Sequence, residues 1–338
     1  MKRLIIILFS LTCTVVAFAQ QNTKKPHNRY GVALKEVDGV WKAGSSKFNN
    51  RTDTIPHFLE PYINPPVYAN LNTANVTSKE YVYKAIPNAN DKKIRAKAGG
   101  YFIFDSPKGQ GDGPFPCLVF IHGGAWTNGS PDDQKIVHLG AFLASQGIAV
   151  ARVAYSKSPD FTIENTLSDL DNAIAFIRQH AKELKVDPNR MGLSGSSAGG
   201  HLSSYMGMTR PGFKVIISMC GPQNLVKLFQ AEQMSEGRGN LLAYFKAEGN
   251  NTVSLEKYSP LFNIPEKDKI PSMLMIHGEW DTSVSFLQSV EMKAALELKG
   301  GEVQFYPVKY ASHSIFDESL ADFRNIVLLI AAYAKEHL

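Results

Sequence analysis

The stretch GLSGSSAGGH, residues 192–201, places three serines within four positions, and only one of them has glycines at the right spacing on both sides. Gly195-Ser196-Ser197-Ala198-Gly199 reads G-x-S-x-G, whereas a frame centred on Ser194 or on Ser196 lacks a flanking glycine. This spacing is typical of a strand that turns abruptly into a helix, with the central serine exposed at a strained tip. Ser197 is therefore the candidate nucleophile, and a plain strand-to-helix turn is the alternative.

The sequence around this turn alternates between apolar runs of strand length and segments with helical spacing, which predicts crossover units and a mostly parallel sheet flanked by helices. Residues that follow the carboxyl ends of such strands are candidates for a site, because ligands gather at that edge. The predicted strands are 80–86, 101–105, 117–124, 147–155, 190–195, 214–221, 272–278 and 302–308, and the predicted helices are 131–146, 164–184, 198–208, 284–299 and 315–338.

Two of these strand ends carry an acid and a base in a suggestive order. His313, in ASHS, follows the strand that ends near Val308, and Asp281, in HGEWD, follows the strand 272–278. The chain order serine, aspartate, histidine predicts that His313 takes the proton of Ser197 and that Asp281 orients the imidazole. Glu279 and Asp317 are the rival acids.

A further strand end carries HGGAW, residues 122–126. Two glycines let backbone N–H groups turn toward a reacting carbonyl, so we expect Gly124 and Ala125, together with Ala198, to donate to a developing oxyanion. His122 is expected to brace the loop by hydrogen bonding. Trp126 is expected to border the acyl pocket, with ordinary packing as its alternative.

HGGAW, GSSAGGH, HGEWD and SHS together resemble the α/β-hydrolase superfamily, and within it the serine esterase branch related to hormone-sensitive lipase and to secreted acetyl and feruloyl esterases. The resemblance covers roughly residues 80–338 and implies an α/β-hydrolase fold and ester hydrolysis through an acyl-enzyme. The branch commonly has HGGG where this chain has Ala125, whose N–H can still donate. A small lid is expected within residues 222–269, where this superfamily often carries one.

The resemblance also bears on the two cysteines beyond the N-terminal segment. In this superfamily the strands that hold Cys117 and Cys220 flank the nucleophile strand. Two strand spacings amount to about 9.6 Å, above the Cα separation of about 7 Å that a disulfide can bridge. We therefore expect two buried thiols that form no disulfide.

The N-terminal segment reads as a leader. Lys2 and Arg3 precede an apolar run from Leu4 to Ala19, which is shorter than the roughly 20 residues of a spanning helix. This pattern predicts a secretory signal peptide over 1–19, cut before Gln20, and a periplasmic or secreted protein. A retained membrane anchor and a lipoprotein at Cys13 are the alternatives. Residues 20–78 are expected to form an extended segment ahead of the catalytic domain, 79–338.

Composition excludes several other classes of function. The 338 residues include 20% charged side chains with a formal net charge of +5, and no basic run stands out, so no nucleic-acid partner is expected. Histidines at zinc spacing and C-x-x-C pairs are both lacking, so we expect no metal and no cofactor. The sequence carries no signal for an oligomeric state.

These observations favour a secreted serine carboxylesterase that acts on short-chain or aromatic acyl esters, such as carbohydrate-linked acetyl or feruloyl esters. An exopeptidase of the prolyl-oligopeptidase kind shares the order of the three residues, but it usually carries a large N-terminal propeller that residues 20–78 cannot form. A non-catalytic binding protein on the same fold is the third hypothesis, and such proteins usually lack one of the three residues.

Overall fold

The structure is a computed structural model that describes residues 34–37, 40–43, 76–86, 90–230, 238–248, 251–316 and 320–338. The chain divides into two compact units, Met1–Pro66 and Val67–Leu338. In the first unit, β1 (Leu34–Val37) and β2 (Val40–Ala43) form a two-stranded antiparallel sheet. The signal peptide, and the expected extended segment 20–78 apart from these two strands and the start of β3, lie outside the described residues.

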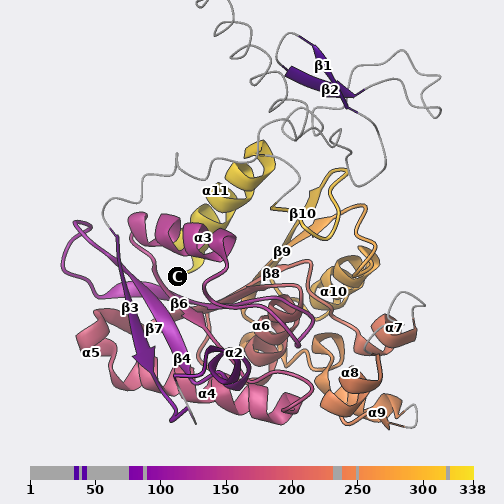
Figure 1. The fold of residues 1–338 in the computed structure, drawn as a ribbon, viewed down its shortest axis with the longest axis horizontal. Helices are drawn as coiled ribbons and strands as arrows, with labels where there is room; N and C mark the ends of the chain where they lie inside the picture. The colour runs from indigo at the N-terminus through magenta and orange to yellow at the C-terminus, as the bar shows by residue number, and fades with distance from the viewer. Residues whose placement is uncertain are drawn as a thin grey trace, which may run out of the picture. The chain divides into compact units, whose positions relative to one another are not determined.

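The second unit is built on an eight-stranded sheet in the order β10-β9-β8-β7-β5-β6-β4-β3 (Figure 1). The six strands from β10 to β6 pair in parallel, while β4 pairs antiparallel with both β6 and β3. A mostly parallel sheet is what the sequence predicts. The strands are β3 (Val76–Val82), β4 (Tyr101–Pro107), β5 (Phe115–Ile121), β6 (Ala149–Val153), β7 (Val186–Ser196), β8 (Val215–Met219), β9 (Ser272–Gly278) and β10 (Val303–Val308).

Helices cover both faces of this sheet, because its central strands are apolar on both sides. Leu118 and Phe120 of β5 pack with α3 (Gln134–Ser145) and α11 (Leu320–His337), whereas Val119 and Ile121 pack with α4 (Ile163–Gln179) and α6 (Ala198–Thr209). Successive residues of a strand point to opposite faces, so an unbroken apolar run predicts burial on both sides. On the α6 side, α10 (Leu287–Leu298) packs against β8 and β9.

The remaining helices are short. The region 222–269, expected to hold a small lid, contains α7 (Leu225–Gln230), α8 (Arg238–Tyr244), α9 (Thr252–Tyr258) and two 3₁₀ turns. Leu228, Phe229 and Phe245 of this region are buried in the core on the α6 face. Two differences from prediction stand out: α2 (Lys92–Ala98) was not expected, and the expected helix 164–184 is divided into α4 and α5 (Ala181–Leu184) at His180.

This arrangement collects the predicted residues at one edge. The strands β5, β7, β9 and β10 run parallel, so their carboxyl ends lie on the same side of the sheet. HGGAW follows β5, Ser197 follows β7, Asp281 follows β9 and His313 follows β10. Within the described part of the chain, no helix is long and apolar enough to cross a membrane.

Candidate active site

Ser197 is the single residue between β7, which ends at Ser196, and α6, which begins at Ala198. Its φ of 53° and ψ of −120° place a non-glycine residue in a strained region of backbone space. The Ser197 N–H donates to the carbonyl of Met219 at 2.8 Å, which fixes this conformation from the end of the neighbouring strand β8. The turn therefore holds the hydroxyl out at the sheet edge.

Gly195 and Gly199 explain why the motif needs glycines on both sides of the serine. A Cβ added to Gly199 would lie 1.9 Å from the carbonyl oxygen of Ile121, and one added to Gly195 would lie 2.4 Å from the Gly199 carbonyl group. Side chains essentially never come so close, so only hydrogen atoms fit where α6 crosses the ends of β5 and β7. The close packing brings the N-terminus of α6 to the nucleophile.

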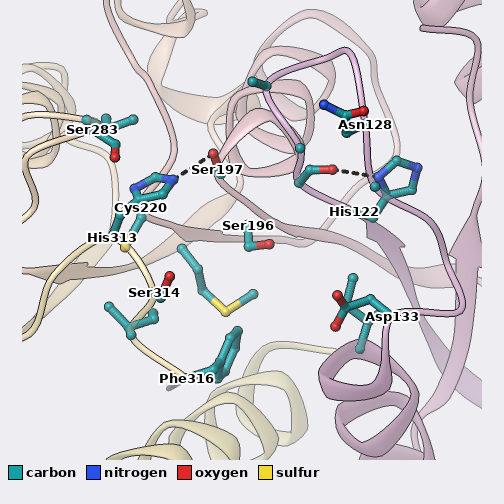
Figure 2. A pocket seen from close by; sticks show the side chains of 18 of the residues that line it. His122, Asn128, Asp133, Ser196, Ser197, Cys220, Ser283, His313, Ser314 and Phe316 are labelled. Carbon is teal, nitrogen blue, oxygen red and sulfur yellow. Dashed lines mark hydrogen bonds between the residues drawn. The ribbon is translucent and has the colours of Figure 1, made fainter. Parts of the chain in front are cut away.

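A continuous chain of hydrogen bonds joins the three predicted residues. His313 Nε2 lies 2.8 Å from Ser197 Oγ (Figure 2). His313 Nδ1 lies 2.7 Å from Asp281 Oδ2. A carboxylate can only accept, so Nδ1 carries the proton and Nε2 is free to accept the proton of the serine. This is the arrangement in which a histidine acts as a general base toward a serine hydroxyl.

Asp281 is held on both of its carboxylate oxygens, and its side chain is fully buried. Oδ1 accepts from the backbone N–H groups of Ser283 and Val284, both at 2.8 Å. Burial alone would raise the pKa of Asp281, but hydrogen bonds from His277 and His313 outweigh it and hold the pKa well below its ordinary value. The carboxylate therefore stays ionised beside the imidazole.

The rival acid Glu279 takes no part in this chain of hydrogen bonds. Glu279 is exposed, and its carboxylate accepts from the backbone N–H of Tyr310 at 3.4 Å. Asp317 lies outside the described residues.

Gly278 also shapes this region, since an added Cβ would lie 2.3 Å from the carbonyl of Ser312. That glycine allows the loops of Asp281 and His313 to pack against each other.

The HGGAW loop turns sharply at the point where donors are expected. Gly124 has a φ of 116° and Ala125 a φ of 51°, both in the left-handed half of backbone space. The Gly124 carbonyl accepts from Thr127 and Asn128, which closes the turn. Among the described residues, the N–H groups of Gly124 and Ala125 donate to no backbone carbonyl. The N–H of Ala198, in the first turn of α6, has no intrahelical acceptor.

Trp126 lines the cavity beside Ser197, yet its side chain is buried. Its indole N–H donates to His201 Nδ1 at 3.2 Å, and its ring packs edge-on against Phe245 at a centroid distance of 5.1 Å. The residue thus joins the cavity wall to the core on the α6 face.

Side chains from two segments brace the HGGAW loop. His122 donates from Nδ1 to the carbonyl of Gly123 at 2.7 Å (Figure 2). Its ring stacks on Tyr155 at a centroid distance of 4.3 Å. Burial and the charge of Lys157 lower the pKa of His122 to about 3, so this ring is neutral. Lys157 is buried as well and donates to the carbonyl of Gly129 at 2.6 Å. The predicted bracing role of His122 agrees with these contacts.

A cavity of about 460 Å³ opens beside Ser197 and His313. Its wall is apolar near the end of β8 and on α7, and it is polar along the loop before α3, where Asn128, Ser130 and Asp133 lie. Figure 2 shows Ser314 and Phe316 beside the histidine and Asp133 across the cavity from it. The apolar wall is formed by Met219, Cys220, Pro222, Leu228 and Val284.

One residue of this site, His277, is not among those predicted from the sequence. It lies at the end of the apolar run of β9, is fully buried, and its Nε2 lies 3.1 Å from Asp281 Oδ2. A histidine four residues before the candidate acid, on the strand that presents it, was the available signal. Its burial inside an otherwise hydrophobic strand hid it among core residues.

Cys220, His277 and Asp281 form the described cluster most like a metal site, with ligand atoms all within 4.8 Å of one another. The atoms are already engaged in hydrogen bonds: both nitrogens of His277 lie within 3.1 Å of protein partners, and both Asp281 oxygens accept from neighbours. A cation here would displace the bond between Asp281 and His313. The donor set therefore fits orientation of the imidazole better than metal binding.

Cys117 and Cys220 are both buried thiols that form no disulfide, as predicted. Cys117 lies on β5 and Cys220 follows β8, with β7 between these strands. Burial raises the pKa of the Cys117 thiol to about 12.

Comparison with known proteins finds similarity to esterases. The BD-FAE family model matches residues 104–296, more than half of the chain. Among curated proteins, isoprenylcysteine alpha-carbonyl methylesterase ICME of Arabidopsis thaliana is 27% identical over 231 residues, covering 62% of this chain and 52% of that protein. Esterase LipQ of Mycobacterium tuberculosis is 26% identical and covers 63% and 55%. The chain thus spans about half the length of the curated relatives it matches.

Solved structures share the fold at lower sequence identity. A truncated carbohydrate esterase from gut microbiota aligns with a TM-score of 0.62 at 19% identity, covering 81% of this chain and 99% of that one. Esterase 2 of the planctomycete Thermogutta terrifontis aligns with a TM-score of 0.61 at 21% identity, covering 78% and 93%. These likenesses establish an α/β-hydrolase-like fold for residues of the second unit.

Proposed function

Because the chain belongs to the BD-FAE family of α/β-hydrolase esterase domains, we propose that it hydrolyses carboxylic esters through an acyl-enzyme on Ser197. One observation carries the proposal: Ser197, His313 and Asp281 form an unbroken hydrogen-bonded chain, with distances of 2.8 and 2.7 Å, at the wall of a cavity. The curated relatives named above are esterases, which supports the same class of reaction.

The reaction proceeds in two halves. Ser197 Oγ attacks the ester carbonyl carbon while His313 Nε2 takes the hydroxyl proton, and that proton then passes to the departing alcohol oxygen. Water repeats the sequence on the acyl-enzyme, giving up its proton to His313 and releasing the acid and the Ser197 hydroxyl. Asp281 stays ionised throughout and stabilises the imidazolium formed in each half.

The developing oxyanion needs donors on the side of the carbonyl away from His313. We assign that role to the N–H groups of Gly124, Ala125 and Ala198. The lack of backbone acceptors for the two loop N–H groups and the open first turn of α6 support the assignment. Preorganised donors of this kind cost no rearrangement when charge develops.

The cavity favours small acyl groups. At about 460 Å³ it has the size of an ordinary small-molecule site, and the apolar wall along β8 and α7 would receive a short or aromatic acyl chain. The polar wall at Asn128, Ser130 and Asp133 would face the alcohol, which suits a hydroxyl-rich leaving group such as a sugar. We propose short-chain or aromatic acyl esters, including carbohydrate-linked ones, as substrates.

Hydrolysis of an ester panel tests the proposal, with acetyl, butyryl, long-chain and feruloyl esters offered to the mature protein. Ser197→Ala should lower kcat/KM by about 10⁴-fold or more. Ser194→Ala is the matched control, because the Ser194 hydroxyl is buried in β7 without a hydrogen-bond partner among the described residues. Cleavage of no ester, or equal activity of the two variants, would refute the proposal.

Export is proposed from residues 1–19. A bacterial host that secretes the full chain should release a protein whose first residue is Gln20, as read by intact mass and N-terminal sequencing. A cell-retained protein that still carries Met1 would contradict cleavage, and a lipid-modified Cys13 would favour the lipoprotein alternative.

A further inference from the structure

His277 makes contacts on both ring nitrogens that determine its tautomer. Nε2 lies 3.1 Å from Asp281 Oδ2 and 3.0 Å from the carbonyl of Val284, and both of these atoms can only accept. Nε2 must therefore carry the proton. Nδ1 lies 2.7 Å from Ser289 Oγ. The ring thus donates from Nε2 and is held in one orientation by α10 and the β9–α10 loop.

Asp281 consequently receives donors in pairs. Oδ1 accepts from the N–H groups of Ser283 and Val284, while Oδ2 accepts from His277 and from His313. The loop backbone alone would fix one oxygen and leave the other directed only by His313. The ring of His277 supplies the second donor at the oxygen that faces the base.

We propose that His277 is a positioning residue for Asp281. His277 donates to Oδ2, the same oxygen that accepts from His313, and thereby limits how strongly Asp281 binds the protonated imidazole of His313. The proposal rests on the proposed function, since it assumes that Asp281 and His313 work with Ser197. His277 is absent from the residues that line the cavity, so it acts through Asp281 and has no direct contact with substrate.

The electrostatic consequence has a definite sign. A hydrogen bond to a carboxylate stabilises its charge and lowers its basicity. Removal of the His277 donor leaves Oδ2 more basic, so it holds the protonated imidazole of His313 more tightly. The base then loses its proton, and becomes active, only at a higher pH.

All other titratable groups stay unchanged in the compared proteins. Of those described nearby, Cys220 has its sulfur within 4.8 Å of the ligand atoms of His277 and Asp281, and Asp133 and Lys135 line the cavity. Glu279, Lys309 and Tyr310 lie on the loops that follow β9 and β10.

The test compares the pH dependence of kcat/KM for the wild type and three variants on one short-chain ester. His277→Phe removes the donor, His277→Gln keeps an N–H near the position of Nε2, and Ser289→Ala removes only the partner of Nδ1. We expect the acid limb to move upward by about half a pH unit or more in His277→Phe. We expect kcat to fall by about tenfold with little change in KM.

The conservative variants separate positioning from a packing role. His277→Gln should restore most of the acid limb and of kcat, and Ser289→Ala should keep the wild-type acid limb because its Nε2–H remains. An acid limb in His277→Phe that coincides with that of the wild type, in a folded and active protein, would overturn the proposal. Esterase activity lost on Ser197→Ala would still stand in that case, so the two failures are distinguishable.

A second measurement uses the wild-type protein alone, so it does not depend on the folding of a variant. Nitrogen-15 spectra of the histidine side chains of the wild type should show a proton on Nε2 of the His277 ring. A ring that is protonated on Nδ1 alone could not donate to Asp281, and this result would overturn the proposal by itself.

Discussion

Three serines compete for one role within residues 194–197, and the backbone distinguishes them. Ser194 points into the core from β7, Ser196 ends that strand, and only Ser197 has the positive φ that carries its hydroxyl to His313. The same principle separates the acids. Asp281 and Glu279 carry the same chemical group, but Asp281 is buried against the imidazole while Glu279 is exposed. Reactivity at this scale depends on surroundings more than on residue type.

Replacement of the two acids tests that distinction. Asp281→Asn should lower kcat/KM on a short-chain ester by about 10⁴-fold, because an amide cannot stabilise the imidazolium and favours the wrong tautomer. Glu279→Gln should stay within about twofold of the wild type, as exposed surface changes usually do. The reverse order, measured by steady-state kinetics, would reassign the acid.

Motif spacing was sufficient to predict Ser197, Asp281 and His313 as residues that meet, because each follows a parallel strand and parallel strands end at one edge. His277 could not be predicted in the same way. It lies inside SMLMIHG, where periodicity indicates a core strand, and its role depends on a tautomer that only the positions of Asp281, Val284 and Ser289 determine.

At the scale of elements, the crossing of β5, β7 and α6 is the tightest packing in the site. Gly199→Ala would place a methyl group 1.9 Å from the Ile121 carbonyl, and backbone cannot yield as a flexible side chain can. We expect this variant to lose at least about 2 kcal/mol of unfolding free energy in urea titration, together with activity.

Gly239 is the matched control for that substitution. It lies in α8, and an added Cβ would meet nothing within 4 Å. Gly239→Ala should change the unfolding free energy by no more than about 1 kcal/mol, in the stabilising direction, because alanine favours the helix. Equal losses for Gly199→Ala and Gly239→Ala would show that close approach is not the reason for Gly199.

The loop that carries the proposed oxyanion donors is tied to the segment after β6. Tyr155 donates to the His122 carbonyl, Ser158 to the Trp126 carbonyl and Lys157 to the Gly129 carbonyl. The sequence motif HGGAW indicated a turn with free N–H groups. It could not show which distant residues hold the turn, since those contacts arise only when β5 and β6 pair.

Lys157 also gives a pH-dependent test of the structure. Burial lowers the pKa of this amine from 10.5 to about 8, so between these values the unfolded chain binds the proton and the folded one does not. The unfolding free energy contributed by this group therefore rises with pH across that window. The unfolding free energy of the wild type minus that of Lys157→Met should rise from pH 8 to pH 10, as measured by denaturant titration. A value that stays constant or falls over this range would contradict a buried amine.

At the scale of the whole molecule, the mostly parallel sheet and the placement of helices on both faces agree with the sequence pattern, since continuous apolar runs require burial on two sides. Short elements were harder to predict: α2 and the helices of 222–269 carry too few residues for a clear period. The relatives share about half of their length with this chain, so activity and substrate are properties to be measured on the chain itself.

The two cysteines of the second unit provide a test at this scale. Cys117 lies on β5 and Cys220 follows β8, with β7 between these strands, so a reducing agent has no covalent link to break between the two thiols. The Tm of the protein should stay within about 1 °C when dithiothreitol is added, whereas removal of a native disulfide typically costs several kcal/mol. A fall of several degrees would show a bond that this fold does not allow.

The central claim is that Ser197 is the nucleophile, and a covalent label tests it most directly. Treatment of the protein with a fluorophosphonate, followed by peptide mass spectrometry, should yield one adduct on Ser197, since this is the hydroxyl that His313 Nε2 contacts among the described residues. The adduct should disappear in Ser197→Ala and persist in Ser194→Ala. A label on another residue, or an esterase that is active but never labelled, would contradict the account.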